Sequence, residues 1–278
     1  MTSRLPPRPV RIAVHVAVYT AALTMLLPFL WMVATSLKTD QEALSGSISL
    51  WPSSWKFSNY AEAVRSAALH RYYINSIVVS VVTTALAGAY NALAGFALAK
   101  MRFTGRNAAL GLCLVTMMLP VTVFFIFAYQ VCAWMGFINN YQGLIIPFLA
   151  SGFGIYYMRQ AIHAVPDSLL EAGRIDGMRN IDVFHHIVVP AVWPAVAALG
   201  IVTFINSWNS FFWPLIVVDS DRMKTLPLAV AELASGQYVQ SWPVRMAAAT
   251  ILTAPLIVIF LIFQRAFIRG VTLSGVKE

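Results

Sequence analysis

The chain has 278 residues, of which 59% are hydrophobic and only 11% are charged, and its mean hydropathy is +0.72. Soluble domains carry about 25% charged residues, so this chain is too apolar for a typical soluble protein. Its high hydrophobic content excludes a disordered chain, and its two cysteines in 278 residues exclude a small secreted disulfide scaffold. The net charge of +8 and the pI of 9.7 do not by themselves indicate a nucleic-acid partner, because the chain is too apolar for such a domain. The expected solvent is the lipid bilayer.

Five stretches contain no Asp, Glu, Lys or Arg: residues 12–37, 72–99, 107–158, 183–218 and 246–264. A spanning helix needs about 20 mostly apolar residues, so four stretches fit one helix each and the 52-residue stretch fits two. The long stretch divides at residues 136–142, where Gly and paired Asn supply turn chemistry. The sequence therefore predicts an all-α integral membrane protein with six transmembrane helices near residues 12–36, 74–99, 108–130, 142–160, 192–217 and 246–266.

Two residue types within these spans predict how the helices bend and pack. Prolines remove a backbone donor and can kink a helix; they occur at Pro28, Pro120, Pro147, Pro214 and Pro255. Small residues in the second span, namely Gly88, Ala92, Gly95 and Ala99, permit the close approach of another helix.

The distribution of basic residues predicts the orientation of the chain. Lys and Arg near span ends are retained on the cytoplasmic side, and twelve of them fall on the side of the two termini against seven on the other. Both termini are therefore expected in the cytoplasm, with the chain crossing its membrane several times. The expected organisation is a cytoplasmic N-terminus (1–11), a six-helix transmembrane domain (12–266) and a cytoplasmic tail (267–278), with a cytoplasmic loop at 165–190 and outer loops at 38–72 and 219–245.

The sequence offers few groups for chemistry. The expected spans contain no Asp, Glu or Lys, and their two arginines, Arg159 and Arg265, lie at cytoplasmic span ends. A Walker loop needs a Gly-Lys pair that does not occur, so energy for uphill transport would have to come from another chain. The hydrolase patterns GxSxG and HExxH are also missing, and no catalytic residue is expected. Cys113 and Cys132 are interpreted as apolar thiols. His185 and His186 beside Asp182 are not expected to bind metal, because adjacent side chains face different directions on a helix.

The most informative segment is the fourth loop, residues 165–190, which is predicted to form two short helices. Pro166 suits the start of the first helix, and Gly177 suits a left-handed stop. The second helix is expected to begin near Asn180 or Asp182 and to end before Pro190. Leu169, Ala172, Gly173 and Asp176 have the spacing of one face of the first helix, and this face is expected to dock into a groove of a partner.

The spacing Glu171-Ala172-Gly173-x3-Gly177-x9-Ile187-x-Val189-Pro190 resembles the EAA loop of permease subunits in binding-protein-dependent ATP-binding-cassette (ABC) importers. The stretch EAGRIDG, with Asp176 before Gly177, is similar to the carbohydrate-importer version of the loop. Gly173 replaces the usual second Ala, Val189 replaces Leu, and Glu278 replaces a terminal Gly. Other matching segments are Asn59-Tyr60, Asn75-Ser76, Trp208-Asn209, Pro214-Leu215, Arg269-Gly270 and Gly275-Val276-Lys277.

The resemblance implies the type I importer permease fold for the domain at 12–266, a location in the plasma (inner) membrane of a prokaryotic cell, and a set of partners. It implies that this chain pairs with a second homologous permease, that two ATPase subunits bind ATP and Mg below, and that an extracytoplasmic solute-binding protein delivers a sugar-like substrate. This chain itself would hold no cofactor or metal, and no nucleic acid is expected as a partner. The residues that would couple the chain to the ATPases are Glu171, Ala172, Gly173, Asp176, Gly177, Ile187 and Pro190.

The fifth span supplies candidate substrate contacts in Asn206, Trp208, Asn209 and Trp213, because amides hydrogen-bond sugar hydroxyls and indoles stack on sugar faces. Helix packing explains the same residues equally well. The sequence leaves oligosaccharides and phosphorylated polyols open as substrates. The alternative functions are an energy-independent channel or facilitator and, from another class, a membrane enzyme or assembly scaffold.

Overall fold

The computed structural model describes residues 8–45, 49–66, 69–235 and 241–275, which form helices and connecting turns with no strand among them. The chain divides into two compact units, Met1–Leu69 with Val230–Ala254 and His70–Ala229 with Pro255–Glu278. Residues 1–7 and 276–278 of the expected cytoplasmic termini, and residues 236–240 of the expected outer loop at 219–245, lie outside the described residues.

The first unit contains α1 (Arg8–Ser36), α2 (Asp40–Leu44) and α3 (Ser58–Ser66). The amide of Asn59 lies against the end of α1, where it donates to the carbonyls of Ser36 and Lys38 at 2.8 and 2.9 Å. The Tyr60 and Ser36 hydroxyls are 2.7 Å apart. The Asn59-Tyr60 pair therefore closes the C-terminal end of α1, whose last carbonyls have no partner within the helix.

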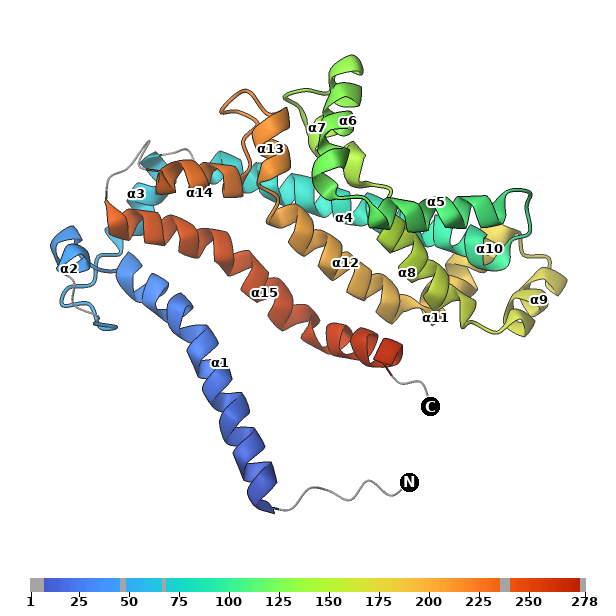
Figure 1. The fold of residues 1–278 in the computed structure, drawn as a ribbon, viewed down its shortest axis with the longest axis horizontal. Helices are drawn as coiled ribbons and strands as arrows, with labels where there is room; N and C mark the ends of the chain where they lie inside the picture. Colours follow the sequence, from blue (N-terminus) through green and yellow to red (C-terminus); the bar gives the residue numbers. More distant parts are fainter. Residues whose placement is uncertain (1–7, 46–48, 67–68, 236–240, 276–278) are drawn as a thin grey trace. The chain divides into compact units, whose positions relative to one another are not determined.

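The second unit begins with the long α4 (Leu69–Lys100) and contains most of the remaining helices (Figure 1). In chain order they are α5 (Arg106–Met118), α6 (Val121–Trp134), α7 (Tyr141–Ile145), η1 (Ile146–Phe148), α8 (Gly152–His163), α9 (Asp167–Ile175), α10 (Asn180–Val183), η2 (Phe184–Val188), α11 (Val189–Ala191), α12 (Trp193–Trp208) and α13 (Phe212–Val217). Two further helices, α14 (Leu226–Ala234) and α15 (Trp242–Gly275), each contribute residues to both units.

Three of the predicted spans are single helices that are long and apolar enough to cross a bilayer. They are Pro9–Ser36, Leu69–Lys100 and Trp242–Ile262, which match the first, second and sixth predicted spans. Pro28 and Pro255 lie inside two of these helices without interrupting them.

The predicted span at 108–130 is not one continuous helix, and the kink expected at Pro120 is present. This segment consists of α5 and α6, which are bent by 110° where the chain passes through Leu119 and Pro120. Leu119 adopts an extended conformation, as the residue before a proline prefers, and Pro120 has no N–H to continue the ladder of α5. Proline at this position therefore ends one helix and starts another.

The fourth and fifth predicted spans are also divided. Residues 142–160 comprise the short α7 and η1 and most of α8, while residues 192–217 comprise α12 and α13, with a break at 209–211. The segment Asn180–Ala191 enters α12 at an angle of 82°. The described residues thus provide three unbroken spans, or up to five if each bent pair counts as one, and the count of six stays a prediction.

The second unit is held together at one end by a cluster of buried apolar side chains that we call the coupling-loop cluster. It joins α4, α8 and the 165–190 loop through residues that include Phe96, Met158, Ile162, Leu170, Val183, Phe184 and Val188. The small residue Gly95 permits this contact, since a Cβ there would lie 2.8 Å from the backbone N of Arg159. The predicted close approach is confirmed at Gly95, whereas Gly88 has open space around it.

Candidate functional site

The first helix of the 165–190 loop is α9, and its boundaries follow from its sequence. It starts at Asp167, directly after Pro166, and Gly177 ends it with a φ of +82°. Met178 N–H donates to Gly173 C=O at 2.9 Å and Gly177 N–H donates to Arg174 C=O at 3.1 Å, which is the hydrogen-bond pair of a Schellman cap. The predicted glycine stop is confirmed.

The second helical segment extends further than the sequence indicated. It starts at Asn180 as predicted, but it continues through η2 to the end of α11 at Ala191, past Pro190. The backbone widens in η2, where Val189 N–H donates to the carbonyl of Phe184 five residues earlier. Such π-turns relax the helical ladder, which lets the chain accept Pro190 without ending the helix there.

The inner side of α9 packs against its own chain. Leu170 and Gly173 are buried, and Leu170 belongs to the coupling-loop cluster. A Cβ at Gly173 would lie 2.7 Å from Cδ1 of the half-buried Ile187. Gly173 is therefore a contact within the chain, and its predicted place on the face that meets a partner is wrong.

The outer side of α9 is exposed. Glu171, Ala172 and Ile175 lie opposite Leu170 and Gly173, and we call these three residues the outer face. Ile175 is 86% exposed, although isoleucine is among the residues most often buried in proteins. Ile175 is not among the residues predicted from the sequence; its i+3 spacing from Ala172 was the available signal. Leu169 and Asp176 are exposed beside this face, as is Gly177 at the helix end.

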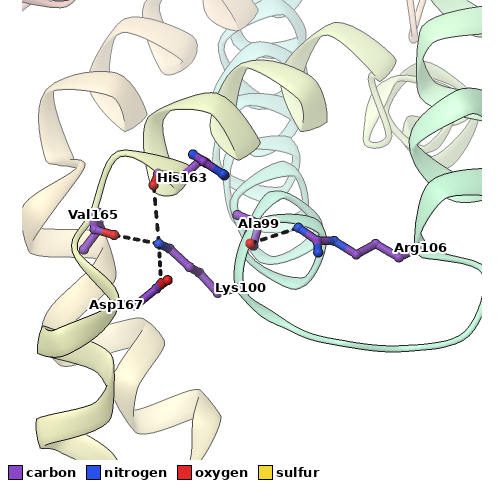
Figure 2. Close-up of polar contacts among 6 residues, drawn as sticks. All are labelled: Ala99, Lys100, Arg106, His163, Val165 and Asp167. Atoms are coloured by element: carbon purple, nitrogen blue, oxygen red, sulfur yellow. Dashed lines mark hydrogen bonds and ion pairs between the residues drawn. The ribbon is translucent and has the colours of Figure 1, made fainter.

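A lysine from the end of α4 fixes the start of α9 (Figure 2). The Nζ of Lys100 donates to the carbonyl of Val165 at 2.6 Å, to that of His163 at 3.4 Å and to Oδ1 of Asp167 at 2.7 Å. The side chain of Lys100 is only 6% exposed, while that of Asp167 is 75% exposed. Lys100 directly follows the predicted span at 74–99, but its acceptors lie more than 60 residues away and could not be identified from the sequence.

Two carboxylates of the loop have their ionised forms stabilised. The hydrogen bond and charge of Lys100 lower the pKa of Asp167 from its ordinary value of 3.8. The pKa of Asp182 is lowered by its hydrogen bonds with Arg179, whose Nε lies 3.0 Å from Oδ2 of Asp182. Both groups are therefore anionic at neutral pH. Asp167 lies at the start of α9 and Asp182 at the start of α10, where a negative charge stabilises the helix through its dipole.

The second unit also contains a cavity of about 420 Å³ between α4, the α6 to α8 region and α12 to α13. Asn206 and Trp213, two of the four predicted substrate contacts, line it. Trp208 is fully buried against Tyr73 and Phe204 and Asn209 is exposed, and neither lines the cavity. The indole N–H of Trp213 donates to Gly143 C=O at 2.9 Å, so only its ring is available to a solute.

Comparison with known proteins places the chain among transport permeases. Residues 91–273 match the family of binding-protein-dependent transport system inner membrane components. The chain is 33% identical over 270 residues to the arabinooligosaccharides transport system permease protein AraQ of Bacillus subtilis (strain 168), with 96% of each chain covered. It is 31% identical to the lactose transport system permease protein LacG of Rhizobium radiobacter, with 92% of this chain and 93% of LacG covered.

The fold is similar to that of a chain in a solved ABC transporter. A chain of a bacterial ABC transporter that imports the acidic polysaccharide alginate superposes with a TM-score of 0.83 at 21% identity, covering 95% of this chain and all of the other. A second structure shows a bacterial alginate ABC transporter in complex with an alginate pentasaccharide-bound periplasmic protein, and it matches with a TM-score of 0.65 at 14% identity. Since the family model covers more than half of the chain, the chain belongs to the family of binding-protein-dependent transport system inner membrane components and is a multi-pass permease of an ABC importer.

Proposed function

We propose that this permease forms one half of the translocation pathway for a sugar-like solute and that the outer face of α9 couples it to an ATPase subunit. In this proposal a second, homologous permease supplies the other half, two ATPase subunits bind ATP and Mg, and an extracytoplasmic solute-binding protein delivers the solute. The chain itself hydrolyses nothing. Both termini and the 165–190 loop lie in the cytoplasm.

The observation that supports the coupling role is that α9 has one side buried against its own chain and the opposite side exposed. Its inner side is fixed by Leu170, Gly173 and the contacts of Lys100, whereas its outer face exposes Ala172 and Ile175. A nine-residue helix is marginal in water unless it is packed against other structure. Because α9 is bound to α4 through Lys100 and to α8 through the coupling-loop cluster, a displacement applied to its outer face is transmitted to these helices as a rigid-body movement.

The proposed solute follows from the relatives and from the cavity. The relatives are named for arabinooligosaccharides, lactose and, at 31% identity, sn-glycerol 3-phosphate. The cavity offers Asn206 and the ring of Trp213, which are a hydrogen-bonding amide and an aromatic surface. A sugar or a sugar-like polyol matches both groups.

The experiment introduces a charge on α9 and compares it with the same change elsewhere in the loop. Ile175→Glu should abolish co-purification of the ATPase with the tagged permease and lower ATP-driven uptake at least tenfold, because it places a buried charge in the proposed interface. Ile181→Glu is the matched control, since Ile181 is an exposed isoleucine of α10 that lies outside the outer face.

The composition of the purified wild-type particle gives the second readout. A second permease and two ATPase copies in the particle would support the proposal. Equal behaviour of the two variants would contradict the role of the outer face, and a stable particle of this chain alone that conducts solute without ATP would replace the proposal with a facilitator.

A further inference from the structure

We propose that residues 49–57, which we call the aromatic loop, anchor the end of α1 in the lipid headgroup region through Trp51, Trp55 and Phe57. The partner of this surface is the bilayer itself. The inference goes beyond the proposed function, which concerns coupling and the solute. In the orientation proposed above, the aromatic loop lies at the extracytoplasmic surface of the membrane.

The three rings of the aromatic loop form one exposed apolar surface. Trp51 is 77% exposed, Trp55 is 52% exposed and Phe57 is 67% exposed. The ring centroids of Trp51 and Trp55 are 6.4 Å apart, and those of Trp55 and Phe57 are 6.2 Å apart with their planes at 17°. Aromatic side chains gain most from burial, so a contiguous group of them on the outside of a chain marks an interaction surface.

Two side chains from the preceding segment hold the backbone of the aromatic loop in place. Lys38 is 2% exposed, and its Nζ donates to the carbonyl of Ser49. The carboxylate of Glu42 accepts from the N–H and the hydroxyl of Ser53, at 3.0 and 2.9 Å. Because the backbone is already fixed, the rings lose little conformational entropy when they enter a binding environment.

The aromatic loop lies where α1 leaves the hydrocarbon core. The span Pro9–Ser36 has 28 residues and is about 42 Å long, whereas the core is about 30 Å thick, so the helix reaches into the headgroup regions. The N–H of Lys56 donates to the carbonyl of Leu37, the residue after this helix, at 2.8 Å. Trp55 and Phe57 flank Lys56 in the sequence and are therefore held beside the end of the span, at headgroup level.

The residue types favour lipid as the partner. Tryptophan is enriched at the boundary between membrane and water, because its ring is apolar and its indole N–H donates to polar headgroup atoms. The exposed Lys56 adds a positive charge that attracts lipid phosphate. None of the most apolar 18-residue window of α1 is buried within the described chain, so lipid has access to the helix that carries the loop.

The test is photocrosslinking in the complete importer, assembled in lipid nanodiscs. Trp51, Trp55 or Phe57 would be replaced, one at a time, by benzoylphenylalanine, which bonds on irradiation to C–H groups within its reach. Mass spectrometry should find phospholipid adducts at each position, attached to the glycerol or to the first carbons of the acyl chains. Leu23, near the middle of α1, is the control for depth, and the same replacement there should attach to carbons nearer the chain ends.

Irradiation with an excess of the solute-binding protein separates lipid from a protein partner. The lipid adducts at the three positions should persist. Adducts with the solute-binding protein or the second permease in place of lipid would overturn the inference, as would no lipid adduct at these positions, whether or not Leu23 gives one. None of these readouts requires transport, so a failure of the proposed coupling role would leave them unchanged.

Removal of the two indoles tests whether the rings anchor the loop. With benzoylphenylalanine in place of Phe57, the double change Trp51→Ser and Trp55→Ser should lower the yield of lipid adducts about threefold or more, because serine lacks the interfacial preference of tryptophan. Trp134→Ser is the matched control and should leave this yield unchanged, since Trp134 is 87% exposed at the end of α6, outside the aromatic loop. Yields that are unchanged in the double variant, or lowered equally in the control, would overturn the inference.

Discussion

Lys100 is the last residue of α4 and Asp167 is the first residue of α9, and their side chains form a 2.7 Å ion pair that joins a membrane helix to the proposed coupling helix. The pair is asymmetric, because the lysine is buried and the aspartate is exposed. The lysine also donates to the carbonyls of His163 and Val165, which are at the end of α8 and in the turn that follows it. One ammonium group thus holds the ends of three helices together.

Lys100→Met should reduce both the stability and the coupling of the permease. It keeps the length of the side chain but leaves two carbonyls and a carboxylate without their donor. We expect a loss of about 3 kcal/mol, because the 2.6 Å bond to the Val165 carbonyl contributes about 1.5–3 kcal/mol as a hydrogen bond to a charged group, whereas the bond to His163 is long and Asp167 is solvent-exposed. The thermal unfolding midpoint of the detergent-solubilised complex and the ratio of solute imported to ATP hydrolysed would be measured.

Lys224→Met provides the comparison, because Lys224 forms a 2.7 Å ion pair with Asp221 outside the 165–190 loop. It should leave the ratio of import to ATP hydrolysis unchanged even if it lowers the unfolding midpoint. An unchanged ratio in Lys100→Met as well would show that the Lys100 contacts do not take part in coupling.

The contribution of Asp167 should depend on pH. Its pKa is lowered in the folded protein, so its contribution to stability is fully present above its ordinary pKa of 3.8 and is lost as the pH falls through the lowered value. Asp167→Asn cannot titrate and should be less stable than the wild type at pH 7. The unfolding midpoints of the wild type and of Asp167→Asn, measured from pH 7 downward, should therefore converge in acid. A difference between the two that stays constant over this range would contradict a stabilising ion pair.

The left-handed conformation of Gly177 should make this position sensitive to a Cβ. Gly177→Ala should destabilise the end of α9 by about 1 kcal/mol, whereas Gly177→Asn should cost less because asparagine tolerates this conformation. Hydrogen exchange of the α9 amides, followed by mass spectrometry, should be about fivefold faster in the alanine variant. Equal protection in the wild type and both variants would mean that the cap does not control fraying of the helix.

Gly173 should tolerate alanine but not valine. Alanine gains about 1 kcal/mol in helix propensity. Its Cβ would lie 2.7 Å from Cδ1 of Ile187 and 3.3 Å from Sδ of Met178, and both atoms lie at the ends of flexible side chains that can shift. Valine adds two methyl groups next to Ile187, Met178 and Val183, where overpacking costs about 1–3 kcal/mol. We expect Gly173→Ala to keep uptake within twofold of the wild type and to raise the unfolding midpoint. A loss of uptake in Gly173→Ala would instead indicate that a partner contacts this position.

The sequence predicted the features of the fold that depend on local chemistry. Charge-free stretches located α1, α4 and α15, and glycine at 177 located the end of α9. Features set by distant contacts were not predictable. Pro120 was a recognised kink candidate, but proline alone does not specify a 110° bend, because Pro28 and Pro255 lie in continuous helices.

The candidate site shows the same division. The sequence shows that α9 contains the small residues Ala172 and Gly173. Which of them packs against the rest of the chain depends on Ile187 and the coupling-loop cluster, which lie far away in the sequence or in other helices. The prediction that Gly173 faces a partner was therefore wrong. In the fifth predicted span, the residue types alone indicate that the amides and indoles are candidate substrate contacts. Only the packing separates Asn206 and Trp213, which line the cavity, from the buried Trp208.

Asn75 and Tyr141 allow a test of the packing at the other end of α4. The buried Asn75 donates to the carbonyls of Arg222 and Lys224, both at 2.9 Å, and its Oδ1 accepts from the Tyr141 hydroxyl at 2.7 Å. Its amide thus connects α4 to the start of α7 and to the segment before α14. Because each hydrogen bond contributes about 0.5–1.5 kcal/mol, Asn75→Ala should cost about 3 kcal/mol and Tyr141→Phe about 1 kcal/mol.

The double variant separates a shared network from independent contacts. Tyr141→Phe should add little to Asn75→Ala, since the bond it removes is already lost, and the unfolding midpoints of the four proteins would form a double-mutant cycle. Additive losses would show that Tyr141 stabilises the fold through other contacts. Since Lys100 ends α4 at the coupling loop and Asn75 lies near its beginning, selective loss of coupling in Lys100→Met but not in Asn75→Ala would assign the transmission of movement to the α9 end of this helix.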